Sequence, residues 1–278
     1  MIIGIVGLGL IGGSLGLDWR AQGHQVLGVS RQTSTCQRAI ERGAVDQASQ
    51  DLGLLASADV IVLCPPIAQI FPVLQALTPH LSPQALVTDV GSVKTAIVLP
   101  CQDHWPRFIG GHPMAGTAEQ GIEAAERGLF VGAPYVLTPT EQTLAADLDT
   151  LINLVNDLQA QVHICSPEAH DQAVAWISHL PVMVSASLIA TCGQEADPQI
   201  LALAQTLASS GFRDTSRVGG GNPELGLMMA QFNRTALLQS LTVYRQALDQ
   251  VVQWLQQEDW AVLYQYLQRT QAERPPFL

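Results

Sequence analysis

The sequence predicts an α/β domain over residues 1–165 and an all-helical domain over residues 166–278. Strand-length apolar segments alternate with helical patterns up to about residue 165, which favours a parallel sheet with helices on both faces. Beyond Ser166-Pro167 the patterns are helical. The length of 278 residues also exceeds one typical domain and suits two.

The individual elements follow from apolar segments and their flanking turns. The predicted strands span Ile2–Val6, Gln25–Val29, Asp59–Leu63, Ala85–Asp89, Arg107–Gly110, Tyr135–Thr138 and Gln161–Ile164. Helices are predicted between most of them, for example over Ala68–Leu77 and Leu144–Leu158. Ser166 suits a helix N-cap, with Pro167 at the first helical position. Long helices then cover residues 167–191, 198–209, 223–256 and 258–272.

A glycine motif, G-x-G-x-x-G, follows the first predicted strand and opens a helix as Gly7-Leu-Gly9-Leu10-Ile11-Gly12. Gly7 allows a tight turn, Gly9 lets the backbone approach a pyrophosphate, and Gly12 lets the helix pack closely on the strand. The N–H groups at the helix start then favour phosphates. The motif therefore predicts a Rossmann-type dinucleotide-binding domain, with Leu10 and Ile11 among the cofactor contacts.

The residues after the second predicted strand indicate which nicotinamide cofactor is bound. An acidic side chain there binds a ribose 2′-hydroxyl and repels a 2′-phosphate. This chain has Ser30 and Arg31 instead, and a hydroxyl with a planar guanidinium suits a phosphate. We therefore expect NADP. Cys64 and Pro65, directly after the strand that ends at Leu63, complete the predicted cofactor contacts.

Composition excludes several classes of function. A net charge of −11 disfavours nucleic acids and anionic membranes. Five scattered cysteines without a C-x-x-C pair, and no basic segment ahead of the first strand, lead us to expect free thiols and a cytoplasmic location. Residues 173–193 carry no formal charge, but their polar residues and Pro181 favour a buried or interface helix over a membrane span. No metal-ligand spacing is recognised, so no metal is expected.

Two polar residues near predicted strand ends are the candidate catalytic groups. Ser92 follows the strand that ends at Asp89, and ligands of open α/β sheets lie outside the carboxyl ends of strands. His112 lies in Gly-Gly-His-Pro, just past another strand. Oxidation of an alcohol needs a base for the hydroxyl proton, and histidine suits that role near neutral pH. Ser92 is expected to hydrogen-bond the His112 ring and fix its tautomer.

The helical domain supplies the candidate substrate-binding groups. Arg213 and Arg217 stand out among only 13 basic residues, since arginine offers a bidentate fork for a carboxylate. Asp214 is expected to pair with Arg217 and hold it. Ser178 and His179 lie on the first long helix, where His170 and Asp171 are further candidates for the lining of the cleft. Pro181 is expected to kink that helix.

Together these residues resemble the prephenate/arogenate dehydrogenase family of tyrosine biosynthesis. The resemblance covers nearly the whole chain and rests on six motifs in order. They are Gly7-Leu-Gly-Leu-Ile-Gly-Gly-Ser14, Asp89-Val-Gly-Ser-Val-Lys94, Gly111-His-Pro-Met-Ala-Gly116, His170-Asp171, Ser178-His-Leu-Pro181 and Gly211-Phe-Arg-Asp-Thr-Ser-Arg217.

The resemblance implies an oxidative decarboxylation. Hydride leaves the ring carbon that bears the 4-hydroxyl, the ring carboxylate leaves as carbon dioxide, and the ring becomes aromatic. By the same resemblance His112 binds and polarises the hydroxyl, Ser92 assists it, and Arg217 binds a substrate carboxylate. A homodimer is also implied, with intertwined C-terminal helical domains that complete each active site.

Two departures from the family pattern bear on the substrate. Many prephenate-using members have a second histidine after His-Leu-Pro, where this chain has Val182, and a tryptophan where it has Gly226. Both differences favour L-arogenate, which carries an amino group in place of the keto oxygen, and leave prephenate as the alternative. The chain length leads us to expect no fused mutase and no C-terminal regulatory domain.

Three alternative functions are weighed against this interpretation. A β-hydroxyacid dehydrogenase would use a lysine of the helical domain, but the only lysine is Lys94. A non-catalytic NADP-binding sensor would leave His112 and Arg217 without a role. A hydrolase is raised by G-x-S-x-G at residues 12–16, yet Ser14 follows the first strand and overlaps the phosphate loop, which does not fit a nucleophile elbow.

Replacing Arg31 tests the cofactor prediction. In Arg31→Asp a 2′-phosphate loses a charged hydrogen bond and meets a like charge, so we expect the KM for NADP to rise at least ~10-fold, with a shift of preference toward NAD. Initial rates with each cofactor measure the ratio. A variant that still strongly favours NADP would show that the 2′-phosphate lies elsewhere.

Overall fold

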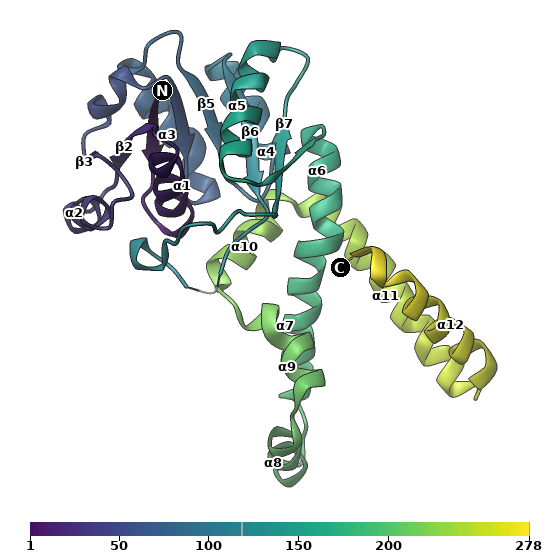
Figure 1. Cartoon of the computed structure of the whole chain (residues 1–278). Helices are drawn as coiled ribbons and strands as arrows, with labels where there is room; N and C mark the ends of the chain where they lie inside the picture. Colours follow the sequence, from purple (N-terminus) through teal and green to yellow (C-terminus); the bar gives the residue numbers. More distant parts are fainter. Residues whose placement is uncertain (118, 278) are drawn as a thin grey trace.

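The computed structural model describes residues 1–117 and 119–277 (Figure 1). Within them, eight strands form one sheet in the order β3-β2-β1-β4-β5-β6-β7-β8. The strands are β1 (Ile2–Val6), β2 (Gln25–Val29), β3 (Gln47–Ser49), β4 (Val60–Leu63), β5 (Leu86–Asp89), β6 (Phe108–Pro113), β7 (Pro134–Thr138) and β8 (Gln161–Ile164). The predicted α/β class is confirmed. The sequence pattern misses β3 because three half-exposed residues show no apolar alternation.

The expectation of a wholly parallel sheet is wrong at one edge. β1 to β6 are parallel, but β6 pairs with β7 in antiparallel register, with His112 opposite Val136. β8 then runs parallel to β7. The described part of the β6–β7 connection contains a short 3₁₀ turn, η3 (Ile122–Ala124), and no crossover helix. The chain therefore re-enters the sheet from the end at which β6 leaves it.

Helices cover both faces of the sheet, as the alternating pattern predicts. They are α1 (Leu10–Ala21), α2 (Thr33–Glu41), α3 (Ile67–Leu77), α4 (Thr95–His104) and α5 (Ala145–Asp157). Alternate residues of β4 point to opposite faces. Val60 and Val62 pack with α1 and α5, whereas Ile61 and Leu63 pack with α3 and α4. Each face thus has its own apolar core, and the sheet between them is rigid enough to position groups at its edge.

Helices alone form the rest of the described chain, which confirms the all-helical C-terminal half. They are α6 (Pro167–Val174), α7 (Leu180–Cys192), α8 (Pro198–Leu207), α9 (Ser210–Ser216), α10 (Pro223–Phe232), α11 (Arg234–Gln256) and α12 (Trp260–Glu273). Ser166 caps α6 as predicted, because its side chain accepts a hydrogen bond from the Ala169 N–H at 3.1 Å. Asp197 and Asn222 start α8 and α10 in the same way, each ahead of a proline.

Two predicted long helices are interrupted. A π-helical turn, η4 (Ala175–His179), separates α6 from α7 just ahead of Pro181, whose missing N–H leaves the ladder one donor short. The predicted 223–256 helix breaks at Asn233, which has non-helical φ and ψ of −118° and 35°. No proline or glycine marks that break, because the Asn233 side chain is engaged in a tertiary contact described below.

Much of the helical half leaves apolar side chains uncovered in the single chain. Figure 1 shows α8 and the α11–α12 pair extending away from the sheet. Ile200, Leu203 and Leu207 share one face of α8 and are all exposed. Pro167–Cys192 is apolar and long enough to cross a bilayer by length and composition, with mean hydropathy of 1.7. Core helices of soluble proteins reach the same length and hydropathy, so these two properties are weak evidence for a membrane span.

Candidate active site

The glycine turn after β1 forms a cradle with space for a phosphate. Gly7 has φ of +101°, and a Cβ there would approach the Cys64 backbone to 2.8 Å. A Cβ at Gly12 would collide with the Gly7 carbonyl oxygen. Gly9 differs, because nothing lies within 4 Å of the position of its Cβ. Gly9 is the N-cap of α1 and offers no side chain to the free N–H groups. This open helix start fits the pyrophosphate of a dinucleotide.

The other predicted cofactor residues surround this cradle. Leu10 and Ile11 form the first turn of α1 and are half-buried. Cys64 and Pro65 follow β4, the strand next to β1, at the point where the strand order reverses. Open α/β sheets bind ligands at such a switch point. Ser30 and Arg31 follow β2 on the other side, and the Arg31 side chain is exposed.

His112 lies in β6, next to a buried ion pair. Lys94 is fully buried and donates to Asp89 Oδ2 at 2.5 Å and to the Gly111 carbonyl oxygen at 2.6 Å. Asp89 Oδ1 in turn accepts the Gly111 N–H at 3.2 Å. Burial lowers the pKa of Lys94, and the Asp89 carboxylate opposes that effect. The ion pair therefore binds both the N–H and the carbonyl group of Gly111, and so fixes the backbone next to His112.

The partner of the His112 ring is His170 and not Ser92, so that part of the sequence prediction is wrong. His112 Nδ1 lies 2.8 Å from His170 Nε2, and His170 Nδ1 lies 2.8 Å from Asp171 Oδ1. The Ser92 Oγ atom is buried and has no hydrogen-bond partner among the described residues. Because α6 carries His170, an element of the helical half holds the ring. The Ser92 hydroxyl is left available to a bound molecule.

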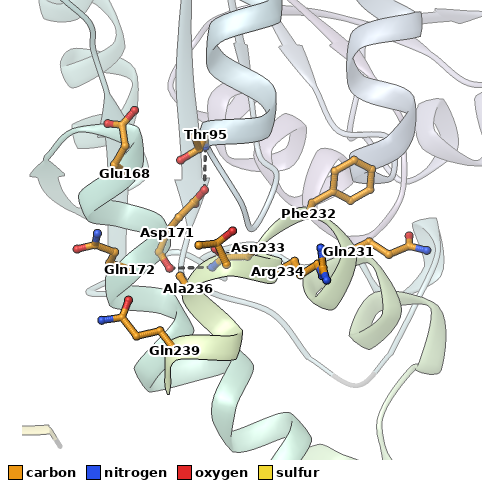
Figure 2. A pocket seen from close by; sticks show the side chains of 11 residues that line it. Thr95, Glu168, Asp171, Gln172, Gln231, Phe232, Asn233, Arg234, Ala236 and Gln239 are labelled. Carbon is orange, nitrogen blue, oxygen red and sulfur yellow. Dashed lines mark hydrogen bonds between the residues drawn. The ribbon is translucent and has the colours of Figure 1, made fainter. Parts of the chain in front are cut away.

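Asp171 joins the two halves of the chain. Its carboxylate accepts the N–H groups of Lys94 at 2.7 Å and Thr95 at 2.9 Å, and so caps α4 from another helix. Its backbone carbonyl accepts from Asn233 Nδ2 at 2.7 Å. Figure 2 shows Asp171 between Thr95 and Asn233. Burial acts to raise the pKa of Asp171, but hydrogen bonds from His170, Lys94 and Thr95 bring it below its ordinary value.

The imidazole rings of His112 and His179 are both neutral near pH 7. Burial, with His170, Lys94 and His179 nearby, lowers the pKa of His112 well below its ordinary value. Burial also lowers the pKa of His179 to about 4. Asn233 Nδ2 lies 3.1 Å from His179 Nδ1, which must accept, so the hydrogen of the neutral ring is on Nε2. That Nε2 atom is buried without a partner in the described residues, so it offers a donor to a bound molecule.

The predicted arginine cluster lies farther from the sheet. Figure 1 places α9 beside the lower part of α7, away from the sheet. Asp214 pairs with Arg213 at 3.3 Å, and not with Arg217 as expected, and both partners are highly exposed. Arg217 begins a 3₁₀ turn, η5 (Arg217–Gly220), that is tied to α7 by a hydrogen bond from the Gly219 N–H to Ser185 Oγ. Within the described chain, no hydrogen bond or ion pair connects Arg213, Asp214 or Arg217 to His112.

Ser178, the remaining predicted substrate contact, lies in η4 and is half-buried.

A separate pocket of about 370 Å³ lies between α6 and the start of α11, lined by Thr95, Asp171 and Arg234 among others (Figure 2). Neither His112 nor the glycine turn lines it, so it is a different place from the candidate active site. Across residues 1–117 and 119–277, no group of three or more histidine, cysteine or acidic side chains is arranged to hold a metal.

Two positioning residues, Lys94 and Asn233, were not given that role by the sequence. Lys94 had one signal, since it is the only lysine and follows Asp89 by five residues. Asn233 had none, because it lies inside an apparent helix. Ser14, the hydrolase candidate, is fully buried, and its Oγ accepts the Glu126 N–H at 3.0 Å. That serine is therefore structural and not an exposed nucleophile.

The sheet order and the glycine cradle define a nucleotide-binding protein with a helical C-terminal half, and its relatives are dehydrogenases. The model of the prephenate dehydrogenase nucleotide-binding domain matches residues 15–164, and that of the prephenate dehydrogenase dimerization domain matches residues 166–269. The chain belongs to the prephenate dehydrogenase family.

Relatives and solved structures agree with the family. A prephenate dehydrogenase of Bacillus subtilis is 30% identical over 94% of this chain and 72% of its own. The crystal structure of Synechocystis arogenate dehydrogenase is 59% identical, covers 100% of both chains and has a TM-score of 0.92. The prephenate dehydrogenase of A. aeolicus, in complex with hydroxyphenyl propionate and NAD+, is 27% identical over 99% of this chain and 97% of its own, with a TM-score of 0.93.

The two central glycines of the cradle predict different outcomes when a methyl group is added. Gly9→Ala should fold with a melting temperature near that of the wild type, because the added Cβ meets no atom of the described residues, yet bind the nicotinamide cofactor about 10-fold more weakly or worse. Gly12→Ala should lower the melting temperature, since overpacking typically costs ~1–3 kcal/mol. Thermal unfolding and cofactor titration separate the two. Unchanged cofactor affinity in a folded Gly9→Ala would contradict the pyrophosphate assignment.

Proposed function

We propose that this protein converts L-arogenate to L-tyrosine and carbon dioxide and transfers the hydride to NADP. The observation that carries the activity is the buried, neutral His112 imidazole near the carboxyl end of β6, at the same edge of the sheet as the dinucleotide cradle after β1. Its second nitrogen has no hydrogen-bond partner among the described residues. Membership of the dehydrogenase family and the 59% identity to a Synechocystis arogenate dehydrogenase support the substrate. NADP rests on Ser30 and Arg31 after β2, where no carboxylate stands.

Each candidate site residue has a distinct role in the proposed reaction. His112 Nε2 accepts the hydrogen bond of the ring hydroxyl, draws its proton as the hydride departs, and returns it to the phenolate oxygen after carbon dioxide leaves. The Ser92 hydroxyl, which has no hydrogen-bond partner among the described residues, donates to the same oxygen. A bound nicotinamide supplies the hydride acceptor. Arg217 and Arg213 bind substrate carboxylate, and the Nε2 hydrogen of His179 provides another buried donor.

The substrate side chain is read at a local patch of α7 and α10. Val182 lies on α7 and Gly226 on α10, and a Cβ at Gly226 would lie 3.7 Å from Val182 Cγ1. The two departures from the prephenate-using pattern are thus neighbours in space. With Val182 in place of a histidine and Gly226 in place of a tryptophan, this patch lacks contacts that suit the keto acid of prephenate. We infer that this patch accepts the amino-acid side chain of arogenate, with prephenate as the alternative.

The assembly we propose is a soluble cytoplasmic homodimer, divided at residue 165 into a cofactor domain and a dimerisation domain. The family model of residues 166–269 is a dimerization domain. Leu248, Val252 and Leu255 share a face of α11 and are all exposed in the single chain. A second copy covers such faces and brings its exposed Arg213 and Arg217 toward a completed site.

Initial rates with arogenate or prephenate and NADP or NAD, four combinations in one buffer, test the proposed function. We expect arogenate with NADP to have the highest kcat/KM. Higher values for prephenate would replace the substrate assignment. Saturable NADP binding without turnover of either substrate would point to the sensor reading instead.

Replacing the proposed base gives a second test. His112→Asn should lower kcat by ~10²–10⁴-fold, the usual contribution of a positioned general base, while the Kd for NADP changes little. His163→Asn is the matched control, because His163 is an exposed histidine on β8. Turnover close to that of the wild type would remove His112 from this role.

A further inference from the structure

A buried row of hydrogen bonds runs from His112 on β6 through His170 to Asp171 on α6. The two imidazole rings meet edge to face, with centroids 5.1 Å apart and planes at 73°. All three residues are buried. Nothing in the reaction proposed above uses His170 or Asp171 directly, so their arrangement needs its own explanation.

The acceptor at one end of these hydrogen bonds is the Asp171 carboxylate, whose position is fixed. The Asp171 carboxylate is held by two N–H groups at the start of α4, at 2.7 and 2.9 Å. Hydrogen bonds keep it ionised, and an ionised carboxylate only accepts. His170 Nδ1 must therefore carry a hydrogen that points to Asp171 Oδ1.

The direction of the row then follows from tautomer chemistry. A neutral imidazole that donates through Nδ1 has a lone pair on Nε2. With His170 neutral, as the proposal below requires, His170 Nε2 accepts and His112 Nδ1 carries the hydrogen across the 2.8 Å contact. The lone pair of neutral His112 is left on Nε2, which has no hydrogen-bond partner among the described residues.

We propose that His170 and Asp171 are positioning residues that hold His112 in the one tautomer able to accept the hydroxyl proton. The inference rests on the role proposed for His112 and adds to it a specific cause for the reactivity of Nε2. With the hydrogens reversed, Nε2 of His112 would carry a hydrogen and could only donate. His112 Nε2 gains a proton during turnover and gives it back, and Nδ1 keeps its hydrogen bond to His170 throughout.

The charges around the ring explain why a distant carboxylate is needed. Burial acts most strongly against a positive His112 ring, and a charge on the neighbouring His170, on Lys94 or on His179 acts in the same direction. Asp89 is engaged by Lys94 and by backbone N–H groups. Asp171, reached through His170, is the carboxylate aligned with the His112 ring. It orients the two dipoles so that a transient imidazolium is stabilised through them.

Substitutions at His170 test the proposal. His170→Phe keeps a planar ring but removes the acceptor, and we expect kcat to fall ~10²–10⁴-fold, as when a catalytic histidine loses its tautomer. The Kd for NADP should change less than about twofold. His170→Gln places an amide oxygen near the lost nitrogen and should recover at least ~10-fold of kcat. His163→Phe and His163→Gln, on exposed β8, are the matched controls.

Nitrogen-15 NMR of histidine-labelled protein reads the tautomer without activity. We expect the His112 signals, assigned by their absence in His112→Asn, to show a protonated Nδ1 and an unprotonated Nε2 at pH 7.5. In His170→Phe that preference should disappear, and the acid limb of the pH profile of kcat should move. A hydrogen on Nε2 of His112 in the wild type would overturn the proposal, even if His170→Phe failed to fold. Wild-type kcat in a folded His170→Phe, or no recovery in His170→Gln, would overturn it too.

The two readouts keep this inference apart from the proposed function. Absence of turnover with arogenate and prephenate would remove the proposed function, and the NMR spectrum would still decide the tautomer. Normal turnover with a hydrogen on Nε2 of His112 would leave the function standing and remove the role of His170.

Discussion

The arrangement of this molecule depends on the burial of one carboxylate, that of Asp171. A buried charge is tolerated only where hydrogen bonds replace its water, and here the donors come from separate parts of the chain. Two backbone N–H groups at the start of α4 and the ring of His170 satisfy it. Because α4 belongs to the sheet domain and α6 to the helical half, satisfying Asp171 fixes one against the other.

A buried ion pair holds β6, the strand that carries His112. Lys94 and Asp89 pair without solvent and both contact Gly111, the residue before His112. A Cβ at Gly111 would lie 2.6 Å from the Asp89 carbonyl oxygen, so only glycine allows this approach. Removing either charge would leave the other buried and unpaired, which is strongly unfavourable. The position of His112 is thus determined from its backbone by one pair and from its ring by the His170 contact.

The helical half follows a different principle. The sheet domain has an apolar core on each face, whereas α8, α9 and α12 have no buried residue within the described single chain. Apolar faces of this extent are typical of subunit interfaces, since they gain stability only when another surface removes them from water. The family model for this half, a dimerization domain, agrees with that requirement.

The sequence by itself determined every strand of the sheet except β3, the glycine cradle and the change from α/β to helices, because each depends on local patterning or on a backbone conformation that glycine allows. It also singled out His112, although it placed this residue just past a strand, whereas the structure has it within β6. It missed the antiparallel β7, the break at Asn233 and the His170 partner of His112, and it paired Asp214 with the wrong arginine. These features arise where segments far apart in the sequence meet, and a donor must find whichever acceptor the packing brings near. Only the tertiary structure decides that, because hydrogen-bond partners depend on distance in space and leave no periodic trace in the chain.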